Sequence, residues 1–213
     1  MDHVRFAPPQ NDPLPGALTV ALATRAYATF WENEVQPDIR AAQPSRPDRR
    51  WHWPLFLRLF PRTELLNGRR CYGHTLIAAD TTGEARPVAM SLLVETVTFL
   101  PASGPSTFLW FMSGIPSTTL RRLGLPLFHS LGQILVDAAL VVSLNQGNDG
   151  RACLHADPQG GKELLARFEH DYGLAKLPAN LQLRSVRKND GRYFYTDDEA
   201  LAQRLVARLA SWR

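Results

Sequence analysis

The segment RACLHAD, residues 151–157, brings together side chains that could do acid–base or nucleophilic chemistry. Its pattern predicts a strand, and alternation along a strand places Cys153, His155 and Asp157 on the same face. A histidine there could carry protons near neutral pH, and a cysteine beside it could be a nucleophile. Neighbours on one strand face point outward in parallel, so the spacing does not require the thiol and the imidazole to touch. A half-buried histidine with a structural role is the alternative.

Glu95 and Tyr172 are further candidates for proton transfer. Glu95 lies in the long apolar segment PVAMSLLVETVTFL, residues 87–100, which predicts a strand, and it could act as a base. A glutamate on a sheet face is more often solvated, and that interpretation stays open. Tyr172 could act as an acid, but helical spacing also places it on an apolar face with Leu164 and Phe168, which is typical of core.

The segment RRLGLP, residues 121–126, precedes an apolar stretch whose spacing predicts a helix over 127–144. A glycine lets the backbone approach an anion closely, and the amides of a helix start point toward such an anion. The predicted anion-binding loop comprises Arg121, Arg122, Leu123, Gly124, Leu125 and Pro126. Leu125 has no side-chain oxygen to cap the helix, and Pro126 suits a first helical turn. The alternative is a plain helix entry with solvated arginines.

The elements that must position these residues follow from periodicity and turn signals. Strands are predicted within residues 70–80, 87–100, 107–112 and 151–157, and a hairpin is predicted across NDG at 189–191. Helices are predicted at 24–36 with Pro37 as the stop, in the aromatic segment 51–60, at 127–144, at 160–173 and near the C-terminus. The prediction is an α/β fold with a twisted, mixed and largely antiparallel sheet flanked by helices.

Composition and charge narrow the class of protein. The chain has 213 residues, of which 45% are hydrophobic and 21% charged, as in an ordinary globular protein. A net charge of +4 fits an anionic ligand, but the arginines are too dispersed to predict a nucleic-acid partner. Cys71 and Cys153 are too few for a disulfide scaffold and lack zinc-site spacing, so no metal is expected. The N-terminus lacks a signal-peptide core and no apolar run predicts a membrane span, so we expect a cytoplasmic protein.

The order of elements after Cys71 resembles that of the GNAT acyltransferase superfamily, from about residue 70 to residue 195. The family's loop pattern is Q/R-x-x-G-x-G/A; residues 121–125 fit it, and Pro126 stands in place of the last small residue. The resemblance implies a GNAT-type fold, acetyl-CoA as the acyl donor, and pyrophosphate bound by residues 121–126. It also implies that Phe111, Met112 and Ser113 form the strand edge that holds pantetheine.

The family often places a tyrosine acid four residues before the glycine that closes the helix after the last of these strands. In this chain that position holds Glu169, with Gly173 as the closing residue. The resemblance therefore leaves the acid unassigned, and His155, Glu95 and Tyr172 are the catalytic candidates. Acyl transfer to an amine needs a neutral amine, a polarised thioester carbonyl and a proton for the thiolate.

The sequence predicts one domain over 1–213, with an irregular arm at 1–16, a helical acceptor-side region at 17–69, and the sheet with the CoA-binding part at 70–213. The predicted function is N-acyl transfer, in which acetyl moves from acetyl-CoA to a primary amine of a small molecule or a protein. A homodimer is compatible with the sequence. Two alternatives stay open: a degenerate member that binds CoA or a protein partner without catalysis, and a basic nucleic-acid-binding module.

Overall fold

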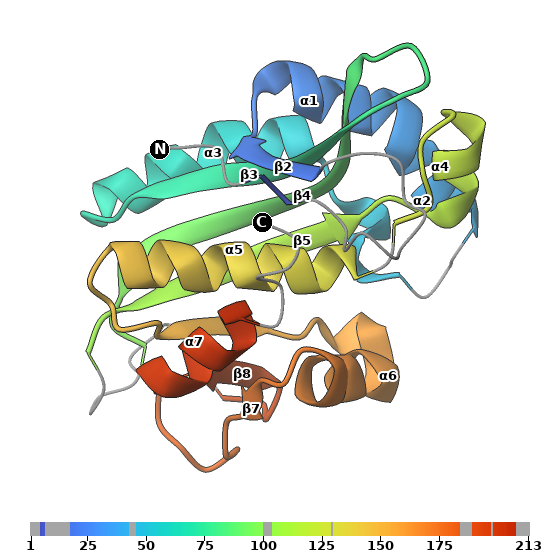
Figure 1. Cartoon of the computed structure of the whole chain (residues 1–213). Coiled ribbons are helices and arrows are strands. Elements are labelled where there is room, and N and C mark those ends of the chain that lie inside the picture. The colour runs from blue at the N-terminus through green and yellow to red at the C-terminus, as the bar shows by residue number, and fades with distance from the viewer. Residues whose placement is uncertain are drawn as a thin grey trace.

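The structure is a computed structural model that describes residues 5–6, 18–42, 46–99, 104–128, 130–183, 189–196 and 198–207. Most of the predicted N-terminal arm lies outside the described residues, as does the part of the predicted second hairpin at 184–188. Within the described part, one sheet carries helices on both of its faces (Figure 1).

The sheet has eight strands in the order β1-β2-β3-β4-β5-β6-β8-β7. They are β1 (Arg5–Phe6), β2 (Leu18–Leu22), β3 (Cys71–Ala79), β4 (Ala85–Val97), β5 (Ser106–Gly114), β6 (Ala152–His155), β7 (Ala175–Lys176) and β8 (Tyr193–Thr196). The pairs are antiparallel except β5 with β6, which run parallel. The predicted mixed, largely antiparallel sheet is therefore confirmed. Parallel neighbours need a crossover connection, and a helix supplies it here.

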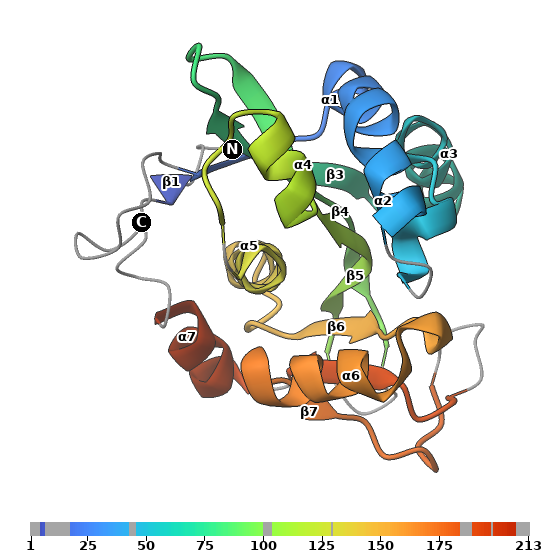
Figure 2. The ribbon, with the colours of Figure 1, turned by 90° about the vertical axis from the view of Figure 1, so that its right-hand side faces the viewer.

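The helices divide between the two faces of the sheet. They are α1 (Arg25–Phe30), η1 (Trp31–Val35), α2 (Gln36–Ala42), η2 (Pro47–Arg50), α3 (Trp53–Leu66), α4 (Ser117–Arg122), α5 (Leu131–Asn145), η3 (Pro158–Gly160), α6 (Gly161–Ala166), η4 (Arg167–Asp171) and α7 (Glu199–Ala207). Figure 2 shows α1, α2 and α3 on one side of strands β3 to β5 and α5 on the other. We call these sides the α3 face and the α5 face.

Alternation along β4 builds a core on each face. Leu92 is fully buried in the cluster that contains Trp31 and Trp53 from the N-terminal helices. The next residue, Leu93, is fully buried in the cluster that contains Leu140 of α5. Burial of such side chains stabilises the fold by about 1.5–3 kcal/mol each. The central strands are thus fixed from both sides, which holds the neighbouring β5 rigidly.

Pro37 does not end the first helix, contrary to the prediction. The chain passes from α1 through the π-turn η1 into α2, which ends at Ala42. In the wider π-turn the N–H of Gln36 reaches back to the carbonyl of Trp31. Pro37 follows this π-turn directly, so the helical chain continues through a residue that has no N–H to donate.

The segment predicted to open a helix closes one instead. The short helix α4 ends at Arg122, and Gly124 follows it in the left-handed conformation with φ 64°. The N–H of Gly124 donates to Arg121 O (3.2 Å) and the N–H of Leu125 donates to Leu120 O (2.9 Å). These two bonds are the Schellman pattern of a helix C-terminus. The following helix α5 begins only at Leu131, so the predicted start at residue 127 is wrong.

Candidate functional site

β5 and β6 separate after a short parallel contact, which opens a gap in the sheet. Their register pairs are Thr107↔Ala152, Phe108↔Cys153 and Leu109↔Leu154. β5 continues to Gly114, whereas β6 ends at His155. The pairing of β4 with β5 skips Trp110, so a bulge lies where the strands begin to diverge. Beyond it, residues 110–114 have no strand partner on the β6 side among the described residues.

The backbone of Met112 faces this gap. Antiparallel strands alternate between residues whose N–H and C=O point toward the partner and residues whose groups point away. The N–H of Ile115 donates to Val88 O on β4 (3.0 Å). Counting back from Ile115, the backbone groups of Gly114 and Met112 point away from β4, toward β6. The carbonyl of Gly114 confirms this direction, because it accepts from Arg46 Nη2 (2.8 Å) and not from β4.

The N-terminus of α5 lies at the same place and offers unused amides. Its N-cap, Ser130, has a left-handed backbone with φ 59° and makes no side-chain capping bond among the described residues. The N–H of Ile134 is the first to bond within the helix, to Ser130 O (3.0 Å). The N–H groups of residues 131–133 therefore have no acceptor inside the helix. They form the positive end of its dipole, which suits an anion.

A cavity of about 710 Å³ fills the gap and reaches the start of α5. Its volume is that of a small-molecule site. The lining includes residues 110–114 of β5, the N-cap Ser130 with residues 131–133 of α5, Leu154 and His155 of β6, Trp51 and part of η2 on the α3 face, and part of η4 on the α5 face. The cavity thus passes through the sheet from one face to the other.

The predicted strand edge lies in this cavity. Phe111, Met112 and Ser113 all contribute to its lining. Phe111 and Met112 are partly exposed, and Ser113 is buried. The structure therefore brings these residues to the gap, while a role in binding a ligand stays a prediction.

The predicted anion-binding loop does not lie in the cavity. None of Arg121, Arg122, Leu123, Gly124, Leu125 and Pro126 is among the described residues that line it. The N–H groups of residues 123–125 bond to carbonyls of α4, so they are not available to a phosphate. Pro126 lies in the connection between α4 and α5 and not in a first helical turn. The physical reason for the error is that glycine after a basic helical turn is also a helix stop.

Arg122 is engaged elsewhere. Its Nη1 lies 3.1 Å from Glu34 Oε2, and its Nη2 lies 3.1 Å from Asp38 Oδ2. The hydrogen bond to Glu34, followed by that to Asp38, raises the pKa of Arg122. Thr119 donates to the same Asp38 carboxylate (2.8 Å). Arg122 thus ties α4 to the N-terminal helices and does not face the cavity.

His155 lines the cavity and has a carboxylate partner that sequence reasoning missed. Its Nε2 lies 3.0 Å from Asp190 Oδ2 and 3.2 Å from Oδ1. The imidazole also packs on Tyr193, with ring centroids 4.5 Å apart. Partial burial opposes ionisation of Asp190, but the hydrogen bond to His155 holds the pKa of that carboxyl below its usual range. Asp190 belongs to the segment NDG, residues 189–191, for which the sequence predicted only a hairpin turn. The hairpin prediction is wrong in its first strand, because β8 pairs with β7 and the described residues 181–183 form no strand.

Glu95 lies away from the cavity. It is near the end of β4 that pairs with the start of β5, and it is not among the described lining residues. Burial, followed by a hydrogen bond with Glu95, raises the pKa of the Tyr72 hydroxyl. Gln146 at the end of α5 donates to the same hydroxyl (3.5 Å). The structure thus gives Glu95 a polar partner in the fold and separates it from His155.

Tyr172 lies in the cavity at the start of α5. It is buried, and its hydroxyl packs so closely on Gly132 that a Cβ at Gly132 would overlap it. Burial raises the pKa of Tyr172, and the charge of Arg167 opposes this. Gln133 Nε2 donates to Asp171 O (3.2 Å), which fixes η4 against the helix start. The tyrosine is therefore both a core residue and a lining residue.

Two other chemical candidates are placed unfavourably. Glu169, which occupies the family's tyrosine position, is exposed and is not among the described residues that line the cavity. Cys153 is buried, and desolvation raises the pKa of its thiol well above the ordinary value. Although alternation places Cys153 on the same strand face as His155, Cys153 is not among the described residues that line the cavity. A cysteine nucleophile is therefore not supported.

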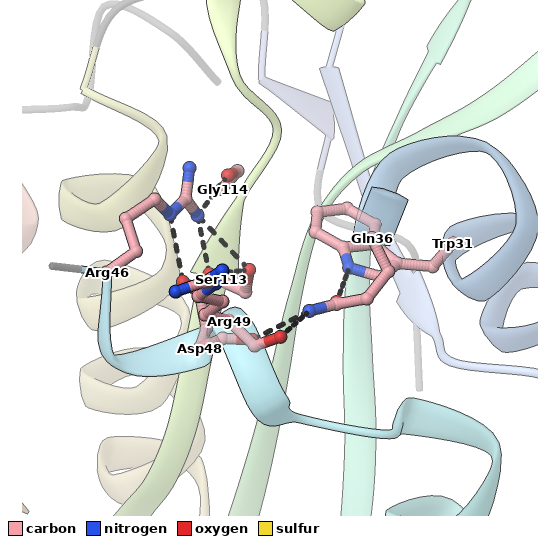
Figure 3. Close-up of polar contacts among 7 residues, drawn as sticks. All are labelled: Trp31, Gln36, Arg46, Asp48, Arg49, Ser113 and Gly114. Carbon is pink, nitrogen blue, oxygen red and sulfur yellow. Dashed lines mark hydrogen bonds and ion pairs between the residues drawn. The ribbon is translucent and has the colours of Figure 1, made fainter. Parts of the chain in front are cut away.

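An ion pair between the half-buried Arg46 and the buried Asp48 joins the α3 face to the end of β5 (Figure 3). Arg46 donates from Nε to Asp48 Oδ1 (2.8 Å) and from Nη2 to Oδ2 (2.5 Å). The hydroxyl of Ser113 donates to the same carboxylate. Gln36 Nε2 donates to the carbonyl of Asp48 (2.7 Å), which fixes η2 from behind. The segment AAQPSRPDRR shows only loop composition, so nothing in it signalled this network.

In the described ranges, no group of three His, Cys, Asp or Glu side chains is placed to hold a metal ion. No helix found in the same residues combines the length and apolar character that crossing a membrane requires.

The sheet order, the parallel β5–β6 pair and the gap beyond it agree with the fold that the resemblance implies. No family model and no curated protein sequence matches the chain. Solved structures are similar to it in fold. They include AtaTR bound with acetyl-CoA (13% identity, 87% of this chain and 96% of that chain covered, TM-score 0.48) and a GNAT-family acetyltransferase from Staphylococcus aureus Mu50 (14%, 84% and 98%, 0.48). Spermidine N-acetyltransferase from Vibrio cholerae in complex with CoA and spermine is similar too (14%, 86% and 97%, 0.48).

Proposed function

We propose that the protein is an acyl-CoA-dependent N-acyltransferase that moves an acetyl group from acetyl-CoA to an amine. The observation that carries this proposal is that the β5–β6 gap opens directly onto the N-terminus of α5. One cavity therefore offers strand backbone to an extended, amide-containing arm and helix amides to a diphosphate.

Acetyl-CoA fits the residues present. The backbone N–H and C=O of Met112 point into the gap, where they can pair with the amides of pantetheine as an added strand would. The N–H groups of residues 131–133 suit the diphosphate. We therefore move the diphosphate from residues 121–126 to residues 130–133. In that segment Gly132 keeps the last glycine of the family pattern, and Ser130, with φ 59°, takes the place of the first.

His155 is the base in this proposal. When bound, the thioester supplies the acyl carbonyl and a thiolate leaving group. His155 removes a proton from the amine, so that the nitrogen has a free lone pair for attack. Asp190 orients the imidazole and stabilises its protonated form. Tyr172 stays protonated because it is buried, and its hydroxyl serves as a donor at the α5 N-terminus. Glu95 drops out of the proposal because of its location.

The acceptor side is the α3 face in this proposal, in line with the expected role of residues 17–69. Alternation in β6 puts Leu154 in the α5-face core and His155 on the opposite face. η2 and Trp51 line the same end of the cavity. The acceptor can be a small molecule or an amine on a protein, and both enter the gap from this side.

Calorimetric titration with acetyl-CoA tests the coenzyme site. Ser130→Glu places a negative charge at the exposed N-cap of α5 and is expected to weaken binding about tenfold or more. Ser117→Glu is the matched control, because Ser117 is exposed at the start of α4 and does not line the cavity among the described residues. Equal affinity of the two variants contradicts the assignment to residues 130–133. No binding to the wild-type protein at about 1 mM contradicts the proposed function itself.

A protein that binds CoA without catalysis is the second candidate. The exposed Glu169 at the family's tyrosine position favours it, since no acid is thereby supplied to the thiolate. Thiol release measured across a panel of amines separates the two candidates. Binding of acetyl-CoA with no thiol release above the buffer rate for any amine selects the non-catalytic candidate.

The cytoplasm is the compartment that we propose. Cys71 and Cys153 are both free and both buried, each on its own strand. Free thiols persist in a reducing compartment. Fractionation of cells that produce the protein, followed by detection with an antibody, checks this assignment.

A further inference from the structure

The α3-face end of the cavity has an aromatic wall made by Trp51, Trp110 and Phe111. All three residues line the cavity, and all three are partly exposed. Trp51 meets Phe111 edge to face with centroids 4.8 Å apart, and Trp110 stacks on Phe111 at 6.0 Å. The bulge at Trp110 explains how two consecutive strand residues reach one face.

A second row of rings behind the wall holds it in place. Phe56 of α3 stacks on Phe111 with centroids 4.6 Å apart and planes inclined at 25°. Phe60, one helical turn further, meets Phe111 at 5.2 Å and Trp110 at 5.8 Å. Such interlocked rings leave the wall little freedom to rearrange. It is therefore pre-formed for a ligand that offers a flat apolar surface.

The charges that line the cavity do not form a site for a polycation. The carboxylates among its described lining residues are Asp48, Asp157 and Asp171. Asp48 is neutralised by Arg46, and its side chain is 5% exposed. Asp157 accepts from the N–H of Gln159 (2.8 Å) as the cap of η3, and Asp171 belongs to η4 on the α5 face. The three carboxylates come from separate elements and form no acidic cluster among the described residues, so they do not provide a site for several ammonium groups together.

We infer that the acceptor is an amine attached to an aromatic or similarly flat apolar group, which packs on Trp51, Trp110 and Phe111 while its nitrogen lies toward His155. This inference rests on the proposed function and adds the class of acceptor. His155 and the wall both belong to the α3 face, and both line the same cavity. Burial of the ring supplies binding energy, and the imidazole at the gap receives the amine proton.

Rates of thiol release with matched amines test the inference. 2-Phenylethylamine is compared with ethylamine, which lacks the ring, and with spermidine, which carries several charges. We expect kcat/KM for 2-phenylethylamine to exceed both others by about tenfold or more. Trp51→Ala is expected to reduce that preference over ethylamine by about tenfold, and Trp51→Phe to retain most of it.

Leu59→Ala is the matched control. Leu59 lies on α3, the helix that carries Phe56 and Phe60, and it is 44% exposed. The substitution removes apolar surface from that helix at a residue that is not among the described residues lining the cavity. It is expected to keep the preference of the wild-type protein. A preference for spermidine, or a Trp51→Ala variant that discriminates as well as the wild type, overturns the inference.

A binding measurement keeps the inference apart from the proposed function. Calorimetric titration of the CoA-saturated protein with 2-phenylethylamine measures binding of the ring without turnover. Saturable binding that is lost in Trp51→Ala but kept in Leu59→Ala supports the aromatic site even if no thiol is released. Thiol release without such binding, and with no preference for the ring, overturns the inference while leaving the proposed acyl transfer intact.

Discussion

Arg46 donates from its Nη2 to the carbonyl oxygen of Gly114, 2.8 Å away, and so pins the last residue of β5 from the α3 face. The same guanidinium pairs with the buried Asp48, to which Ser113 also donates. The strand edge that faces the gap is thus held by a side chain from the N-terminal region. Loss of this contact should disturb both stability and the cavity.

Arg46→Met should destabilise the fold strongly. It leaves the Asp48 carboxylate, 5% exposed, without its cation, and breaking a buried pair in this way costs about 3–5 kcal/mol. Replacing both partners with apolar residues, as in Arg46→Met with Asp48→Leu, should cost less than Arg46→Met alone. Urea denaturation measures both. If Arg46→Met is as stable as the wild type, the pair of Arg46 with Asp48 does not contribute to the stability of the fold.

Gly132→Ala should also destabilise the protein, because its Cβ would overlap the Tyr172 hydroxyl and lie 3.0 Å from Cζ. Overpacking of this kind costs about 1–3 kcal/mol. Tyr172→Phe removes the hydroxyl and should recover part of the loss in the double variant. Thermal denaturation of the wild type, the two single variants and the double variant gives the coupling free energy between Gly132 and Tyr172. Additive losses would show that the hydroxyl does not press on Gly132.

His74 should make stability depend on pH. Burial lowers the pKa of His74 from 6.5 to about 4, so the unfolded chain binds a proton that the folded chain does not between these values. The contribution of His74 to the free energy of unfolding is therefore fully present above pH 6.5. It is lost as the pH falls toward 4, which lowers the free energy of unfolding by about 3 kcal/mol in total. His74→Leu should flatten this part of the curve. His170→Gln, at an exposed histidine of η4, is the control and should keep the slope of the wild type.

Both thiols should be inert in the folded protein. Desolvation, followed by the charge of Glu64, raises the pKa of Cys71 to about 12, and desolvation raises that of Cys153 as well. The thiolate is the reactive form, so Ellman's reagent at pH 8 should find no fast-reacting thiol. Unfolding in guanidinium should expose both. Rapid labelling of Cys153 in the folded state would reopen the nucleophile interpretation.

Asp190→Asn should lower kcat while the affinity for acetyl-CoA stays within about twofold of the wild type. Asp190 acts through His155, whose Nε2 it contacts at 3.0 Å, so it is a positioning residue. Loss of the partner carboxylate should reduce kcat about 10–100-fold, as loss of such orienting groups does. The acid limb of the pH–rate profile should move as well, which a purely structural role would not cause. Asp149→Asn, at an exposed surface carboxylate, is the control.

The sequence predicted the strands that carry Met112 and His155, but it misplaced the start of the helix α5. Alternation predicts a strand face from local sequence, and Phe111, Met112, Ser113 and His155 lie in the lining of the cavity, where their roles stay predictions. Helix ends are less distinct. Basic residues in a last turn, a glycine and then a proline are also the signal for a helix C-terminus, and RRLGLP has that meaning here. The true start did carry a signal, because Ser130 and Gln133 have the spacing of a capping box, although Ser130 makes no side-chain capping bond among the described residues.

Long-range partners explain the rest of what sequence could not supply. Asp190 lies 35 residues from His155, and Asp48 lies 65 residues from Ser113. Each pair meets only because the sheet brings distant segments together. The position of Glu95 outside the described lining of the cavity could not be predicted for the same reason, since its place along β4 relative to the gap depends on the register with β5. Periodicity predicts on which face of the sheet a side chain lies, but not where along the neighbouring strand that residue is paired.

The short β5–β6 contact has a mechanical consequence. Three register pairs, from Thr107↔Ala152 to Leu109↔Leu154, join strands β1–β5 to β6–β8 within the sheet. Each part is otherwise tied together by its own antiparallel ladder. A rotation of strands β6–β8 relative to strands β1–β5 about this short contact would change the width of the gap. It would break no hydrogen bonds between the antiparallel strands within either part.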